Sequence, residues 1–156
     1  EAKDLSAIET LRRYFDTAGR WKETQKSFML DLFRVWHADA NAIMRQKQES
    51  ASIKRIAPML AVIVRQGMNE GVFSTKYPEQ FANMFVGLSH GFEDKLVELL
   101  LTDHPPPDAL QRLEALIDAY SDSLERILGA PPGSLPLGDI NVLKEWLEDP
   151  VEATKS

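Results

Sequence analysis

The chain has 156 residues, of which 44% are apolar and 27% are charged, a composition typical of one soluble globular domain. It contains no cysteine, which excludes disulfides, thiolate metal sites and cysteine nucleophiles. The net charge of −6 disfavours binding to phosphate backbones. No apolar run approaches the roughly 20 residues that span a bilayer, and no signal peptide is visible. We therefore expect a cytoplasmic protein with no membrane partner.

Apolar residues recur at helical spacing in the first half of the chain, and no alternating strand pattern is present. The first helix is expected over about residues 3–18, with Gly19 ending it. A second helix is expected over about 21–47. It is apolar around so much of its circumference that it predicts a central position or the lining of a cavity. A third helix is expected over about 51–68, with either a kink at Pro58 or a start close to it.

The second half of the chain predicts two further long helices and a short one. The fourth helix is expected from Pro78 to about residue 102. The fifth is expected over about 107–129, closed by Gly129. Proline and glycine then mark a turn-rich linker, and a short helix is expected at about 139–148.

These elements predict an all-α fold, an antiparallel bundle of five main helices plus a short C-terminal helix. We divide the chain into residues 1–129, which form the bundle, and residues 130–156, which form a linker, the short helix and a flexible tail.

No catalytic or metal-binding constellation is found. The sequence has no nucleophile elbow, phosphate-binding glycine loop or zinc-ligand spacing. His90 and Glu93 lie three residues apart on one helix, but a di-metal site would need further glutamates and Glu-x-x-His pairs from other helices. We interpret them as surface polar contacts and expect no enzyme activity, no cofactor and no metal.

A short pattern in the middle of the chain resembles the C-terminal domain of TetR-type transcriptional regulators. A helix ends in Gly-x-x-Glu-Gly-Val-Phe, and Pro-Glu-x-x-Ala and two spaced glycines follow it. The residues that carry this resemblance are Gly67, Glu70, Gly71, Val72, Phe73, Pro78, Glu79, Ala82, Gly87 and Gly91. The number and lengths of the helices agree with that family from about residue 3 to 129.

The resemblance implies a ligand-sensing and dimerisation domain that controls DNA binding by an N-terminal helix-turn-helix domain. That DNA-binding domain is absent from this sequence, which opens in what would be the helix after it. The fragment alone is therefore not expected to bind nucleic acid. The resemblance further implies a cavity for a small-molecule effector and a homodimer interface made from the last two long helices.

The residues themselves also favour a homodimer through the fourth and fifth helices. Two glycines one turn apart in a helix interior cost roughly 1 kcal/mol each against alanine, so they need a packing reason. That reason is close approach of a helix from a second copy, or of the fifth helix of the same copy. The predicted interface consists of Gly87, Gly91, Lys95, Leu99, Leu113, Leu116, Ile117, Tyr120, Leu124 and Ile127.

Large apolar groups with a few polar ones among them favour a pocket for a hydrophobic or aromatic effector. The predicted pocket residues are Phe28, Met29, Phe33, Trp36, His37, Met59, Ile63, Gln66, Met84 and Phe85. Such stripes also occur in ordinary helical cores, and that alternative stays open. The alternative function is a helical homo-oligomeric interaction protein with no small-molecule ligand.

Overall fold

The computed structural model describes residues 5–25, 28, 31–32, 35, 42–102 and 105–148 of the chain. Within these ranges it contains helices and no strand, which confirms the expected all-α class. In chain order the helices are α1 (Ala7–Thr24), α3 (Ala42–Asn69), α4 (Phe81–Leu100), α5 (Ala109–Leu128) and α6 (Ile140–Glu148).

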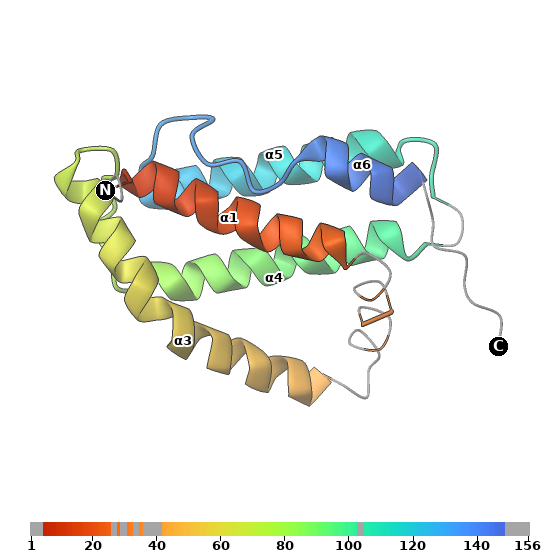
Figure 1. Cartoon of the computed structure of the whole chain (residues 1–156), viewed down its shortest axis with the longest axis horizontal. Helices are drawn as coiled ribbons and strands as arrows, with labels where there is room; N and C mark the ends of the chain where they lie inside the picture. Colours follow the sequence, from red (N-terminus) through yellow and green to blue (C-terminus); the bar gives the residue numbers. More distant parts are fainter. Residues whose placement is uncertain are drawn as a thin grey trace.

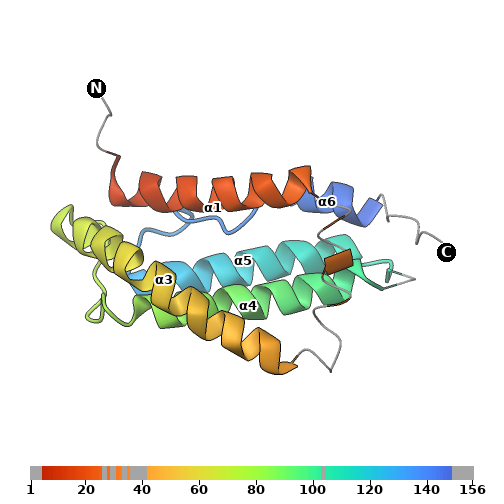
Figure 2. The ribbon, with the colours of Figure 1, turned by 60° about the horizontal axis from the view of Figure 1, so that its bottom comes forward.

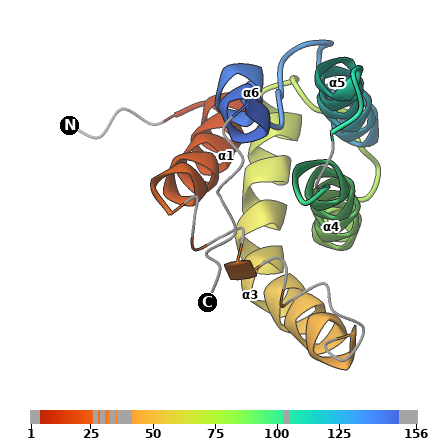
Figure 3. The ribbon, with the colours of Figure 1, turned by 90° about the vertical axis from the view of Figure 1, so that its right-hand side faces the viewer.

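Helices α4 and α5 lie side by side and run in opposite directions, while α3 crosses them at an angle (Figures 1 and 2). Figure 3 shows α1 and the α4–α5 pair on opposite sides of α3, which packs against both α1 and α4. The short helix α6 packs on α5 and also touches α4.

The main core forms where α1, α3, α4 and α5 meet. Leu11 of α1, Leu60 and Val64 of α3, Phe81 of α4 and Leu124 of α5 are fully buried in one cluster. Burying an aliphatic or aromatic side chain of this size contributes about 1.5–3 kcal/mol relative to leaving it exposed. The cluster therefore holds the ends of these four helices together.

Helix α1 extends beyond the position predicted for its end. It was expected over about 3–18 with Gly19 as its stop, but it begins at Ala7 and continues through Gly19 to Thr24. A glycine ends a helix when it adopts the left-handed conformation, whereas Gly19 lies inside α1. Inside a helix a glycine costs only about 1 kcal/mol relative to alanine, which is too little to end the helix by itself.

The predicted boundary between the second and third helices is wrong. Residues 42–68, divided in the prediction, belong to the single helix α3, and residues 21–24 belong to α1. The polar run around residues 45–50 suggested a helix end, but glutamine, lysine and glutamate are good helix formers. Most of their side chains are exposed, so the run is one solvent-facing stretch of a continuous helix.

Pro58 lies inside α3 and does not start it. Figure 1 shows that α3 changes direction along its length. A proline inside a helix removes one backbone hydrogen bond and crowds the preceding turn, and it is an established cause of such bends.

The predictions for the second half of the chain agree more closely with the structure. Helix α4 begins at Phe81, three residues after Pro78, because residues 78–80 form a turn. Helix α5 ends at Gly129, whose φ of 63° is left-handed, as predicted. The short C-terminal helix is also found where it was expected.

Residues 130–139, which we call the strap, join the main core. Leu135 is fully buried in the same cluster as Leu11 and Leu124. After the strap, Trp146 of α6 is buried against Val97 of α4. The segment that follows α5 therefore packs along the body of the protein as far as α6.

No helix within the described ranges is both long and apolar enough to cross a membrane.

Candidate functional site

The turn after α3 is built around two glycines with different roles. The Gly67 carbonyl accepts hydrogen bonds from Val72 N at 2.9 Å and Phe73 N at 3.0 Å. A Cβ at Gly67 would overlap the ring of Phe73, which is buried. Gly71 has a φ of 74°, a conformation that favours glycine. Close packing thus explains the first glycine and backbone conformation explains the second.

This turn also ties together the ends of three helices. Oε2 of Glu70 accepts a hydrogen bond from Ala7 N at 3.0 Å, at the start of α1. Nε2 of Gln66 donates to Leu5 O at 2.8 Å. On the other side, Ser74 N donates to the Leu128 carbonyl at 2.8 Å, at the end of α5. The turn therefore sets where α1, α3 and α5 meet.

The start of α1 has a second cap that the sequence prediction missed. Ser6 N donates to Oε2 of Glu9 at 2.9 Å, and Glu9 N donates to Oγ of Ser6 at 3.3 Å. Ser-x-x-Glu before an apolar helix is the sequence signature of this reciprocal cap. The pattern was therefore readable and would have placed the start of α1 near Ala7.

The two glycines of the predicted dimer interface have different surroundings. A Cβ at Gly91 would lie 2.9 Å from the hydroxyl oxygen of Tyr120, so the close approach of α5 in the same copy accounts for this glycine. A Cβ at Gly87 would meet nothing within 4 Å. Nothing among the described residues of this copy accounts for Gly87.

The other predicted interface residues fall into three groups. Leu113, Ile117 and Leu124 are buried inside the protein, so they pack within one copy. Four are partly buried: Leu99, Leu116, Tyr120 and Ile127. Lys95 is exposed, and its Nζ lies 2.8 Å from Oε2 of Glu98. The hydrogen bond and charge of Glu98 raise the pKa of Lys95, and Lys95 lowers the pKa of Glu98 in the same way.

The structure brings only some of the predicted pocket residues together. Ile63 and Phe85 lie in the main core cluster. Phe28, Met59 and Met84 are 58%, 41% and 38% exposed. The side-chain amide of Gln66 binds Leu5 O and Oε1 of Glu70, so it belongs to the turn after α3. The remaining four, Met29, Phe33, Trp36 and His37, lie outside the described residues.

An aromatic cluster between α1 and α4 surrounds Phe85, a predicted pocket residue, with rings that were not predicted as part of the site. Phe15 stacks on Phe85 with ring centres 5.6 Å apart, and the Tyr14 ring meets both edge-on. Phe81 lies 5.9 Å from Phe85. Tyr14 and Phe15 were not among the predicted pocket residues, and the residue spacing gave no sign that they face Phe85.

A depression of about 360 Å³ lies on the surface of the first half of α3. Among its lining residues are Lys47 and Lys54, and none of the predicted pocket residues lines it.

Among the described residues, no group of three or more histidine, cysteine, aspartate and glutamate side chains is arranged to hold a metal. Nδ1 of His90 lies 3.7 Å from Oε2 of Glu49 on α3.

Comparison with known proteins gives one family. Residues 31–101 match the tetracyclin repressor-like C-terminal domain family. This stretch contains the turn after α3 and all of α4, where the sequence resemblance was placed. No curated protein and no solved structure gives a significant match to the chain.

Proposed function

Because residues 31–101 match the tetracyclin repressor-like C-terminal domain family, we propose that this chain is the dimerising, effector-sensing part of a TetR-type transcriptional regulator. DNA would be bound by a separate helix-turn-helix domain and not by this acidic chain, whose net charge is −6. Residues 1–129 would form the regulatory domain proper, with residues 130–156 following it and the strap packed into its core. We assign it no catalytic step, no cofactor and a cytoplasmic location.

The observation that carries the proposal is the family match, and Gly87 supports its dimerisation part. An exposed glycine inside a helix lowers stability by about 1 kcal/mol relative to alanine. Among the described residues, no side chain and no other segment of the same copy lies within 4 Å of its Cβ position, so packing among them does not explain it. A helix of a second copy that approaches closely would.

The surface around Gly87 fits a second copy. Met84 is 38% exposed on the same helix. On the neighbouring helix α5, the small residues Ala115 and Ala119 are exposed. A two-fold contact between two α4–α5 pairs would form a four-helix bundle with self-complementary surfaces. The interface we propose leaves out the three predicted residues that are buried within one copy, Leu113, Ile117 and Leu124. It keeps Gly87, Lys95 and the partly buried residues Leu99, Leu116, Tyr120 and Ile127.

The dimer is tested by sedimentation equilibrium of the wild-type chain and of Gly87→Leu. The wild type should be a dimer at micromolar concentration. The leucine side chain should hold the partner helix away and raise the dissociation constant at least tenfold. Gln48→Leu is the matched control, because it adds a leucine to an exposed position of α3. A wild-type monomer would contradict the dimer, and a Gly87→Leu dimer as tight as wild type would contradict this interface.

For the effector we propose a hydrophobic or aromatic compound bound beside the aromatic cluster of α1 and α4. Tyr14 and Phe15 are only partly buried although they contact the buried ring of Phe85. Aromatic and aliphatic side chains with a few polar groups are the usual lining of small-molecule sites. Ile63 and Phe85, two of the predicted pocket residues, belong to the same core cluster.

A further inference from the structure

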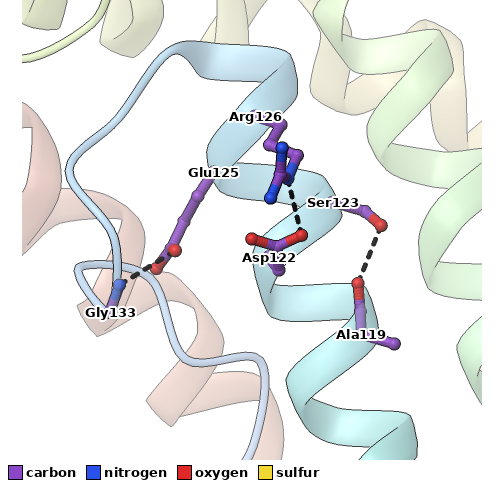
Figure 4. Close-up of polar contacts among 6 residues, drawn as sticks. All are labelled: Ala119, Asp122, Ser123, Glu125, Arg126 and Gly133. Carbon is purple, nitrogen blue, oxygen red and sulfur yellow. Dashed lines mark hydrogen bonds and ion pairs between the residues drawn. The ribbon is translucent and has the colours of Figure 1, made fainter.

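The strap is fastened to α5 by a buried carboxylate. Glu125 is only 6% exposed, and each of its two oxygens accepts a backbone hydrogen bond. Oε1 accepts from Leu135 N at 2.8 Å. Oε2 accepts from Gly133 N at 2.9 Å, and Figure 4 shows Glu125 reaching Gly133. A buried carboxylate is costly unless its oxygens are hydrogen-bonded. The strap thus satisfies Glu125 while Glu125 fixes the path of the strap.

Two further features hold the strap in one conformation on α5. Gly133 has a φ of 73°, and Ser134 N donates to the Pro131 carbonyl at 3.2 Å, which closes a tight turn. One helical turn before Glu125, Oγ of Ser121 accepts a hydrogen bond from Leu137 N at 3.0 Å. Contacts one turn apart on α5 therefore hold the strap along the helix.

The opposite side of the strap faces α1. Nε of Arg12 donates to the Ser134 carbonyl at 2.6 Å. Leu135 is fully buried in the cluster that also contains Ala7 and Leu11 of α1. Figures 1 and 2 show the strap passing between α1 and α5. The strap therefore links α1 to α5, while α1 packs directly on α3.

We infer that the strap is an intramolecular latch that holds α1 against α5, with Arg12 and Glu125 as its positioning residues. Glu125 sets the strap on α5, and the strap presents the Ser134 carbonyl and the Leu135 side chain to α1. Loss of the Glu125 contact or of the Arg12 contact lets α1 move away from α5, while α4 and α5 stay in place.

A regulatory consequence follows, and this part rests on the proposed function. In a TetR-type regulator a DNA-reading segment N-terminal to α1 would move with α1, so the latch would set how freely that segment moves. The strap lies outside residues 31–101 that match the family. The match also leaves out α1 and α5, so the latch rests on the contacts of this structure and not on the family match.

The latch is tested by hydrogen exchange of backbone amides in Arg12→Ala, with Arg13→Ala as the matched control. Both arginines are exposed neighbours on α1, but only Arg12 is seen to contact the strap among the described residues. Arg12→Ala should speed exchange in α1 about tenfold and leave α4 unchanged, since a charge-assisted hydrogen bond opposes local opening of α1. Arg13→Ala should match the wild type.

Glu125→Gln tests the other end of the latch. A neutral amide has one acceptor oxygen for two backbone donors, so strap amides and α1 amides should both exchange faster, again with α4 unchanged. Faster exchange in the strap alone, or equal effects of Arg12→Ala and Arg13→Ala, would overturn the latch. If Glu125→Gln does not fold, the pair of arginine variants decides. The expected changes in exchange depend on contacts within one copy. The test of the latch therefore stays valid even if the proposed dimer or the proposed effector binding is wrong.

Discussion

Ser121 contacts the strap and Ser134 belongs to it, and the two differ in whether the hydroxyl group has a partner. Oγ of Ser121 accepts the hydrogen bond from Leu137 N. Oγ of Ser134 is buried and has no hydrogen-bond partner among the described residues. A buried polar atom without a partner keeps its desolvation cost, whereas a satisfied one contributes about 1 kcal/mol.

This difference predicts opposite results for two identical substitutions. Ser134→Ala should leave the free energy of unfolding unchanged or raise it by up to about 1 kcal/mol, because it removes the unsatisfied hydroxyl. Ser121→Ala should lower it by about 1 kcal/mol, because Leu137 N loses its acceptor. Urea unfolding followed by circular dichroism measures both, and a larger loss for Ser134→Ala than for Ser121→Ala would contradict the assignment.

At the scale of the element, α4 contributes both to the core and to the proposed dimer interface. Its inner side supplies Phe81, Phe85 and Val97 to the core clusters. Gly87 is exposed and has no neighbour within 4 Å of its Cβ position among the described residues, whereas Gly91 faces the hydroxyl group of Tyr120 on α5. The two glycines look equivalent in the sequence but are expected to respond differently to the same change.

Gly87→Ala should raise the free energy of unfolding of the monomer by about 1 kcal/mol, since alanine is the better helix former and its methyl group would contact none of the described residues. Gly91→Ala should gain less or lose stability, because the Tyr120 side chain has to shift to admit a Cβ at 2.9 Å. Urea unfolding below the dimer dissociation constant isolates these monomer effects. Equal effects at the two positions would show that the local contacts of α4 do not control them.

At the scale of the whole molecule, the proposed dimer interface and the proposed effector site lie on different sides of the protein. The outer side of α4 and α5 would meet a second copy. The partly buried rings of Tyr14 and Phe15, on the side of α1, would meet an effector. Both sides share the main core, which contains residues of α1, α3, α4 and α5, so binding on one side can bias the other.

Effector binding is tested by thermal unfolding of the chain against a panel of hydrophobic and aromatic compounds. A true effector present at a hundred times its dissociation constant should stabilise the protein by about 2.7 kcal/mol. For a domain of this size that corresponds to a rise in Tm of about 5–10 °C. Phe15→Leu should reduce the rise, and Tyr77→Leu, on an exposed turn residue, should not. A dimer that no compound stabilises would favour the alternative, an oligomeric protein without a ligand.

Local chemistry was sufficient to predict several elements. Gly129 ends α5 in the left-handed conformation, and helical periodicity located α4, α5 and α6 to within a few residues. The Gly-x-x-Glu-Gly-Val-Phe pattern located the turn after α3. In each case the signal lies within a few residues of the feature it predicts, so no distant contact is needed to read it. Local signals also gave two wrong helix ends, at Gly19 and at the polar run around residues 45–50. In the structure α1 continues through Gly19 and α3 continues through the polar run.

The sequence by itself therefore determined the helical class, the turn after α3 and the existence of apolar faces on α4 and α5. Only the tertiary structure decided that Leu113 and Leu124 are covered by their own chain, that Gly91 admits Tyr120 and that Gly87 stays open. It also decided that Leu135, in a proline- and glycine-rich segment, completes the core. The physical reason is that periodicity shows which side of a helix avoids water, whereas the residues that cover that side come from segments far away in the chain.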